Sequence, residues 1–460
     1  MIYHDIERHA GLLPDYSELR VHENRSLAIT VLNGDVVGNQ REQTAGASAR
    51  AHHSGVFGFA STPLIDDGAI ARVVGTAAAN ARFLASRAGR GPLKLPPTSA
   101  SAVHDLSSTK PRLSQKGTID FARALDAWLV EKHPHLLSRM IFIGLLEVEK
   151  HLLTSEGSVS SSLVPRAVLA ARVSMKGRGQ DRVEVSDVFG GGGCFEDHFD
   201  DPAALHPMLD EACAKLARKA EGVYADSGVH DVVLGPDLAG ILAHEAIGHT
   251  VEADLVLGGS VAGDRMDQVV ASELVSIVDF AHTYRGVTCP QPVWVDDEGT
   301  PARDAVLIDR GVLRSFMHNK ETARHFGAEP TGNARAWSFS DEPLVRMRNT
   351  AILPGASRLD GMIASIDHGY YLARPSNGQA DSTSEFMFGI TQGCEIRGGK
   401  LGRAIFDTTV SGVAFDMLKT VTMVSDDMRW ESAGMCGKKQ PMPVGMGGPA
   451  IKCRIRIGGR

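Results

Sequence analysis

Two histidines and a glutamate lie close together near the middle of this 460-residue chain, in the segment His244-Glu245-Ala246-Ile247-Gly248-His249. Imidazole nitrogens are common ligands of Zn²⁺, and a carboxylate beside them can take a proton from water. The combination therefore indicates a metal site that hydrolyses a substrate. A His-Glu pair also occurs on solvated helix faces, so the motif by itself leaves an ordinary surface as an alternative.

The spacing of the two histidines differs from the HExxH pattern of zinc proteases, in which the ligands are four residues apart. Here they are five apart, which in a regular α-helix separates them by about 140° around the axis and about 7.5 Å along it. Rings placed in that way would not meet at one ion. A π-type turn, whose hydrogen bonds span five residues, brings them onto one side, and Gly248 permits such a distortion. We therefore expect a bulged or kinked helix over residues 244–249.

A third protein ligand is needed, because catalytic zinc usually has three protein ligands and one open position. Glu252 and Asp254 follow the motif closely. The chain also contains six cysteines, whose thiolates bind zinc strongly. Spacing alone leaves all of these candidates open.

The stretch from His244 to Asp254 resembles the HEAxGHxxExD signature of the TldD/PmbA family of metallopeptidases. Other segments resemble the family's motifs and occur in the same order, namely Val295–Gly299, Thr331–Arg335, Arg346–Thr350, Cys436–Lys438, Pro443–Gly445 and Pro449. The resemblance extends from about residue 229 to 458, with a weaker match near the N-terminus. Several motifs in order are more specific than one, so the resemblance favours the metal site.

The resemblance to the catalytic, TldD-like branch implies that Zn²⁺ is held by His244, His249 and Cys436, with Glu245 as the general base. It implies peptide substrates and a dimer that encloses the active site in a chamber. The dimer would be a homodimer or would pair the chain with a non-catalytic PmbA-like chain. Glu252 or Asp254 is expected to accept a hydrogen bond from a ligand imidazole.

Polar residues in two of the other matching segments are candidates for substrate binding. Asn333 and Arg335, and likewise Arg346 and Arg348, have side chains that can bind a peptide carboxylate or backbone. Structural ion pairs explain the same residues equally well.

Three functions fit these residues. The first is a zinc peptidase that acts on unfolded or small peptides. The second is an amide hydrolase that processes a peptide-like or aminoacylated metabolite. The third is a non-catalytic scaffold with a structural metal, against which Glu245 argues, because a structural zinc needs no general base.

The elements that must position the motif follow from the apolar patterns. Val229–Leu234 reads as a buried strand, and Pro236 suits the first turn of a helix that carries residues 237–249. Upstream we expect a β-meander over 16–60 with a turn at Asn33-Gly34-Asp35, helices over 66–89, 119–132 and 201–225, strands over 139–153 and 166–175, and a loop over 90–118. The predicted fold is α+β. An N-terminal β-meander and helix domain spans 1–225, with a soft boundary within 176–235, and a β-rich C-terminal domain that carries the metal-binding helix spans 226–460.

The composition limits the partners and the cellular compartment that we expect. The net charge is 48 − 55 = −7 without a basic stripe, so we expect no nucleic-acid partner. The charged N-terminus lacks an apolar core, and no run approaches 18 apolar residues, so we expect neither a signal peptide nor a membrane span. The six cysteines include no CxxC pair, which favours a cytoplasmic protein with reduced thiols.

Overall fold

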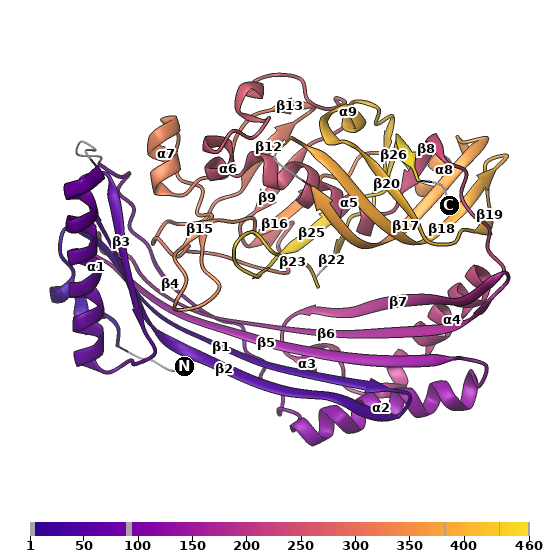
Figure 1. Ribbon diagram of the computed structural model, residues 1–460, viewed down its shortest axis with the longest axis horizontal. Helices are drawn as coiled ribbons and strands as arrows, with labels where there is room; N and C mark the ends of the chain where they lie inside the picture. Colours follow the sequence, from indigo (N-terminus) through magenta and orange to yellow (C-terminus); the bar gives the residue numbers. More distant parts are fainter. Residues whose placement is uncertain (1–4, 89–93, 381–382, 432, 459–460) are drawn as a thin grey trace.

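A long, twisted sheet forms the N-terminal part of the protein (Figure 1). The computed structural model describes residues 5–88, 94–380, 383–431 and 433–458. The strand order is β3-β2-β1-β5-β6-β4, and β7 also pairs with β6. The pairs are antiparallel except that between β4 and β6. The strands are β1 (Tyr16–Leu32), β2 (Asp35–His53), β3 (Val56–Thr62), β4 (Ser101–Asp105), β5 (Ser138–Thr154), β6 (Val159–Gly177) and β7 (Gln180–Gly192).

The chain reverses between β1 and β2 through Asn33 and Gly34, whose φ angles are 51° and 91°. Positive φ at both central residues is the type I′ geometry, which matches the twist of the paired strands and favours Asn-Gly. The predicted turn is confirmed. The β-meander expected over residues 16–60 consists of β1, β2 and β3, and β1 pairs without interruption with β5 along its polar middle.

Helices cover parts of this sheet through apolar faces at helical spacing. They are α1 (Asp67–Ala88), α2 (Gln115–Lys132), α3 (Phe195–His198) and α4 (His206–Ala220). The helix α1 packs on β2 and β3, and α2 and α4 share a second core with the other half of the sheet. The expected helices are confirmed, but the third is shorter than predicted, because Pro202–Leu205 form a separate 3₁₀ turn. The loop prediction over 90–118 is wrong at β4, whose alternating, largely polar residues sit at the sheet edge, and over 115–118, which begin α2. Residues 90–93 of this prediction lie outside the described residues.

The C-terminal half lies on one side of the long sheet, and α2 lies on the other (Figure 1). Its strands are mostly short and form two larger mixed sheets, ordered β13-β12-β9-β16-β25-β22 and β17-β8-β26-β20-β18-β19, together with small hairpins. The strands are β8 (Gly228–Leu234), β9 (Ile277–Phe280), β10 (Thr283–Tyr284), β11 (Val287–Thr288), β12 (Ala305–Asp309), β13 (Val312–Leu313), β14 (Ala334–Arg335), β15 (Leu344–Val345), β16 (Asn349–Ile352), β17 (His368–Ala380), β18 (Glu385–Arg397), β19 (Lys400–Ala404), β20 (Thr408–Val413), β21 (Met423–Val424), β22 (Arg429–Glu431), β23 (Met435–Cys436), β24 (Met442–Pro443), β25 (Gly445–Gly448) and β26 (Ile451–Ile457). The helices are α5 (Pro236–Leu242), α6 (Ala253–Leu257), α7 (Lys320–Phe326), α8 (Leu359–Ala364) and α9 (Ala414–Lys419). The predicted α+β fold with a β-rich C-terminal half is confirmed.

Helix α5 packs against both larger sheets, touching β25 of one and β17 of the other. A Cβ at Gly240 would approach the backbone of Gly447 to 3.1 Å, so the helix lies directly on β25. Its apolar residues join the main C-terminal core. The helix that leads into the histidine motif is therefore fixed on two sides.

We propose a domain boundary between α4 and β8. Residues 16–192 supply the strands of the first sheet, and residues 228–457 supply those of the two larger C-terminal sheets. The Val295–Gly299 segment connects the two parts: Asp297 accepts a hydrogen bond from Lys150 of β5 at 2.6 Å, and Glu298 pairs with Arg50 of β2. One motif of the resemblance thus joins the two halves.

None of the helices in the described ranges combines the length and the apolarity that a bilayer crossing would require.

Candidate metal centre

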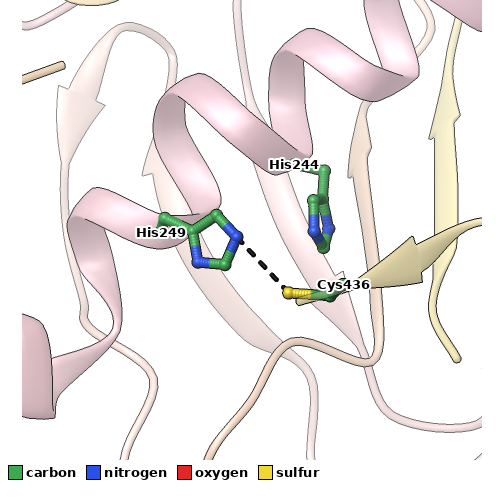
Figure 2. Close-up of side chains that lie close together, drawn as sticks. All are labelled: His244, His249 and Cys436. Atoms are coloured by element: carbon green, nitrogen blue, oxygen red, sulfur yellow. Dashed lines mark hydrogen bonds between the residues drawn. The ribbon is translucent and has the colours of Figure 1, made fainter. Parts of the chain in front are cut away.

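The two histidines are brought together by a single π-helical turn. Strand β8 leads through Gly235 into α5, which begins with Pro236, and the chain then widens into a π turn over Ala243–Gly248. The N–H of His249 donates to the carbonyl of His244, five residues earlier. As a result both rings project toward the same point, with centroids 5.2 Å apart (Figure 2). The predicted distortion of the helix at 244–249 is confirmed.

Gly248 serves this turn through packing rather than through unusual dihedral angles. Its backbone is right-handed helical, with φ −52° and ψ −50°. A Cβ at this position would lie 2.0 Å from Sδ of the buried Met347. The motif therefore needs glycine because Met347 occupies the space beside the second histidine.

The third member of the cluster comes from far along the chain. Cys436 lies on β23, and its Sγ is 3.4 Å from Nε2 of His249 (Figure 2). One ligand atom from each of His244, His249 and Cys436 lies within 4.8 Å of the others. Ligand atoms around a tetrahedral zinc are about 3.3–3.8 Å apart, so this cluster needs only small adjustments to hold such an ion.

His244 supplies an independent test of the fit. Its side chain is 1% exposed, and among the described residues neither Nδ1 nor Nε2 has a hydrogen-bond partner. A buried polar atom without a partner costs about 1–3 kcal/mol, so native proteins rarely leave one unsatisfied. A cation beside Cys436 would satisfy one of the two nitrogens. Two imidazoles and one thiolate with an open position are a donor set that suits zinc.

The charge of the Cys436 sulfur also suits a cation. Burial by itself would raise the pKa of the Cys436 thiol, but the imidazoles of His244 and His249 lower the pKa to about 4. The sulfur is therefore a thiolate at neutral pH, which is the form that binds metals. Burial by itself would lower the pKa of His249, but Glu252 and the Cys436 sulfur raise that pKa to about 10. A metal ion bound at Nε2 of His249 would therefore displace a proton.

Glu252 orients one ligand ring. Its Oε2 is 2.7 Å from Nδ1 of His249, so Nδ1 carries the hydrogen and Nε2 faces Cys436. Burial alone would raise the pKa of Glu252, but the charges of Lys438 and His249 lower it to about 2. In the described part of the chain Asp254 makes no hydrogen bond to either ligand ring; its two oxygens each accept from Lys438 Nζ at 2.9 Å. The two acidic residues after the motif thus have different surroundings.

Glu245 lies beside the cluster without joining it. Its Oε2 is 3.7 Å from Nε2 of His249, and its side chain is 20% exposed. It lines an open groove with a cavity volume of about 1090 Å³. This position allows its carboxylate to reach a water or a substrate next to His249.

Most residues that line the groove are apolar or glycine. They include Leu255, residues at the facing ends of β17, β18 and β20, and residues next to Cys436. Met387 and Met435 are 59% and 50% exposed there. Polar side chains are contributed by Glu245, His249, Glu385, Ser411 and Lys438.

Asn333 and Arg335 lie outside this groove. Asn333 is fully buried and donates to Asp279 Oδ2 and to the Arg346 carbonyl, each at 2.9 Å. Arg335 is 4% exposed and donates to the carbonyls of Met347 and Pro443. These contacts favour a structural role over contact with a substrate.

Arg346 and Arg348 are also buried, and Arg346 contacts the backbone of Cys436. Arg348 pairs with Asp279 at 2.9 Å, and both side chains are fully buried. Arg346 donates to the carbonyls of Cys436, at 3.0 Å, and Gln440, at 2.9 Å. The sequence pattern suggested that Arg346 binds substrate and gave no sign that it contacts the backbone of Cys436. Lys438 was part of the matching segment Cys436–Lys438, but the pattern assigned it no role.

Comparison with known proteins places the chain in a family. Residues 227–459 match the family model described as PmbA/TldA metallopeptidase C-terminal domain. The chain belongs to the PmbA/TldD metallopeptidase family. A second model of the family, PmbA/TldA metallopeptidase domain 1, matches residues 17–81. The family resemblance drawn from the motifs is confirmed.

Relatives within the family share part of their length with this chain. A protein named metalloprotease TldD homolog from Buchnera aphidicola (strain APS) is 40% identical over 240 residues, which cover 51% of this chain and 49% of the relative. A zinc metalloprotease TldD homolog from Saccharolobus solfataricus is 33% identical over 286 residues, covering 61% of this chain and 62% of the relative. The match thus spans about half to three-fifths of these two relatives.

A solved structure shares the fold over the whole chain. The crystal structure of TldE from Thermococcus kodakarensis superposes with a TM-score of 0.74, covering 99% of each chain at 17% identity. At this identity the likeness concerns the fold alone.

Proposed function

We propose that this chain is a zinc-dependent peptidase that hydrolyses peptide bonds of unfolded or small peptides. One observation carries the proposal: His244, His249 and Cys436 converge beside Glu245 at an open groove. The Saccharolobus relative is named a zinc metalloprotease, which supports zinc as the cofactor. The thiolate among the donors favours zinc over harder metals.

The site residues have distinct tasks in this proposal. His244, His249 and Cys436 would hold the ion, which would supply Lewis-acid chemistry that polarises the scissile carbonyl and makes water easier to deprotonate. Glu245 takes the proton of the attacking water and delivers it to the leaving amine nitrogen. Glu252 keeps the ring of His249 in the orientation that faces the cluster.

The groove fits a chain rather than a single side chain. Its volume of about 1090 Å³ is close to the upper limit of ordinary ligand pockets, about 1000 Å³. The apolar side chains of Met387 and Met435 offer contact to substrate side chains, while Gly412 and Gly437 leave room near the backbone. We therefore propose extended peptide segments as substrates.

The proposed assembly is a dimer that encloses this groove in a chamber, either with a second copy of the chain or with a non-catalytic PmbA-like chain. The shared fold with TldE supports a partner of that kind. A reducing compartment such as the cytoplasm agrees with the free thiols of Cys194, Cys213, Cys289, Cys394, Cys436 and Cys453.

The test compares the wild type with Glu245→Gln, using Glu329→Gln, an exposed glutamate elsewhere in the same half, as the matched control. Zinc content is measured first, and hydrolysis is then followed on unstructured peptides, folded proteins and aminoacylated small molecules. We expect Glu245→Gln to retain zinc and to lose about 10²–10⁴-fold in peptide hydrolysis. A variant with zinc and full activity would contradict the role of Glu245. Activity confined to the small molecules would replace the peptidase with the metabolite hydrolase, and a wild type with zinc but no hydrolysis would indicate a scaffold.

A further inference from the structure

The segment that begins with Cys436 is held by polar contacts with the C-terminal half. Arg346 binds the carbonyls of Cys436 and Gln440, and Arg335 binds that of Pro443. Lys438 reaches Asp254 and the carbonyl of Val345. These contacts fix the residues from Cys436 onward.

The residues just before Cys436 are held by the other half of the protein. Arg166 lies on β6 of the N-terminal sheet, and its Nη1 and Nη2 are each 3.1 Å from the carbonyl oxygen of Gly434. Its Nη1 is also 3.8 Å from Sδ of Met435. Gly434 is two residues from Cys436, so this guanidinium reaches directly to the strand that presents the sulfur.

Arg166 is placed to hold its position. Its side chain is 8% exposed, and burial lowers the pKa of the guanidinium to about 10, so the group stays charged at neutral pH. A buried guanidinium needs hydrogen-bond acceptors, because leaving its N–H groups unpaired away from water costs free energy. Strand β6 is paired on both sides at this residue, with Leu146 of β5 and Gly192 of β7. A rigid element therefore supports the contact.

The Gly434 end of the contact is equally constrained. Its carbonyl also accepts the N–H of Val444 at 3.1 Å. A Cβ at Gly434 would lie 2.4 Å from Cε of Met446, so the backbone packs closely against β25. A displacement of Gly434 would therefore move the neighbouring β23 rather than be absorbed locally.

We propose that Arg166 is a positioning residue for the metal centre, through which the N-terminal sheet holds the Cys436 sulfur within reach of His244 and His249. The inference rests on the metal site of the proposed function. Metal ligands tolerate displacements of only about 0.5 Å, so support from a rigid element decides whether three donors converge. Docking of the two halves and metal binding are then coupled, and each strengthens the other.

The experiment uses the full chain and two methionine variants. Arg166→Met keeps the aliphatic stem and removes the donors. Arg172→Met is the matched control on the same strand, where the side chain is 47% exposed and faces Glu184 at 3.9 Å. Zinc affinity is measured by competition with a chelator, and alkylation of Cys436 in the metal-free protein is followed by mass spectrometry.

We expect Arg166→Met to weaken zinc binding by about 10–100-fold, as loss of outer contacts does at other metal sites, and to speed alkylation of Cys436. Arg172→Met should behave as wild type in both measurements. Wild-type zinc affinity and wild-type alkylation in Arg166→Met would overturn the proposal.

A second variant and the alkylation rates cover two further outcomes, a variant that does not fold and a wild type that binds no zinc. If Arg166→Met does not fold, as judged by circular dichroism, Arg166→Lys replaces it; a lysine keeps the charge with a single nitrogen and should weaken zinc binding by about 3–10-fold. A wild-type affinity in Arg166→Lys would then reject the proposal. If the wild type binds no zinc, the proposed function fails, whereas the alkylation rates still decide whether Arg166 positions Cys436.

Discussion

Lys438 Nζ lies 3.2 Å from Glu252 Oε2, so the residue two positions after Cys436 contacts the carboxylate that orients His249. The same ammonium binds Asp254. The cysteine segment and the histidine turn are therefore joined twice, once at the cluster and once through this ion pair.

This arrangement separates the roles of the two acidic residues. We predict that Glu252→Gln weakens zinc binding by about 10–100-fold, because the His249 ring loses its charged acceptor. Asp254→Asn should have a smaller effect, because Asp254 acts only through Lys438. Chelator competition measures both affinities. An unchanged affinity in Glu252→Gln would show that the His249 ring is fixed by other contacts.

Cys436 is predicted to be the third ligand. Cys436→Ser should lose most bound zinc on dialysis, because a neutral hydroxyl is a much poorer ligand than the thiolate that Cys436 forms here. Cys394→Ser on β18 is the matched control and should keep wild-type zinc content. Metal analysis of the two purified variants measures their zinc content. Full zinc content in Cys436→Ser would assign the third position to another side chain.

Gly248 is predicted to tolerate no side chain. Gly248→Ala would place a methyl 2.0 Å from Sδ of Met347, and overpacking of this kind costs about 1–3 kcal/mol in the free energy of unfolding. Gly75→Ala in α1 is the control, because a Cβ there meets nothing within 4 Å, and it should stabilise by up to about 1 kcal/mol. Urea unfolding measures both. A stable Gly248→Ala variant would mean that Met347 moves aside at little cost.

His318 is predicted to make the protein sensitive to mild acid. Its side chain is 3% exposed, and burial, helped by the charge of Arg303, lowers its pKa to about 4. The unfolded chain, with a histidine pKa of about 6.5, binds more protons than the folded one between these values, so stability falls as the pH drops from 6.5 to 4. The loss from pH 7 to pH 5 should be about 2 kcal/mol from this residue.

The variant His318→Gln isolates that contribution. The difference in unfolding free energy between pH 7 and pH 5 should be smaller in His318→Gln than in the wild type by about 2 kcal/mol. The two proteins are compared by urea unfolding at each pH. Equal pH dependence in both would show that His318 can take up a proton without leaving its buried site.

Local features of this protein could be predicted from the sequence. The five-residue spacing of His244 and His249 indicated a bulged or kinked helix, because a regular α-helix would hold the two rings apart. The turn at Asn33 and Gly34 and most helices followed from residue preferences and apolar periodicity. These features depend on neighbours along the chain, and their physical causes are visible in the order of residue types.

The rest was decided by tertiary structure. Spacing could not choose Cys436, 187 residues from His249, and only the family resemblance pointed to it. Nor could it distinguish Glu252 from Asp254, assign Asn333 and Arg335 to internal contacts, or single out Arg166. Each of those roles depends on which strands lie against each other and in what register. Packing between segments far apart in the chain sets this arrangement, and residue types alone do not show which distant segments come into contact.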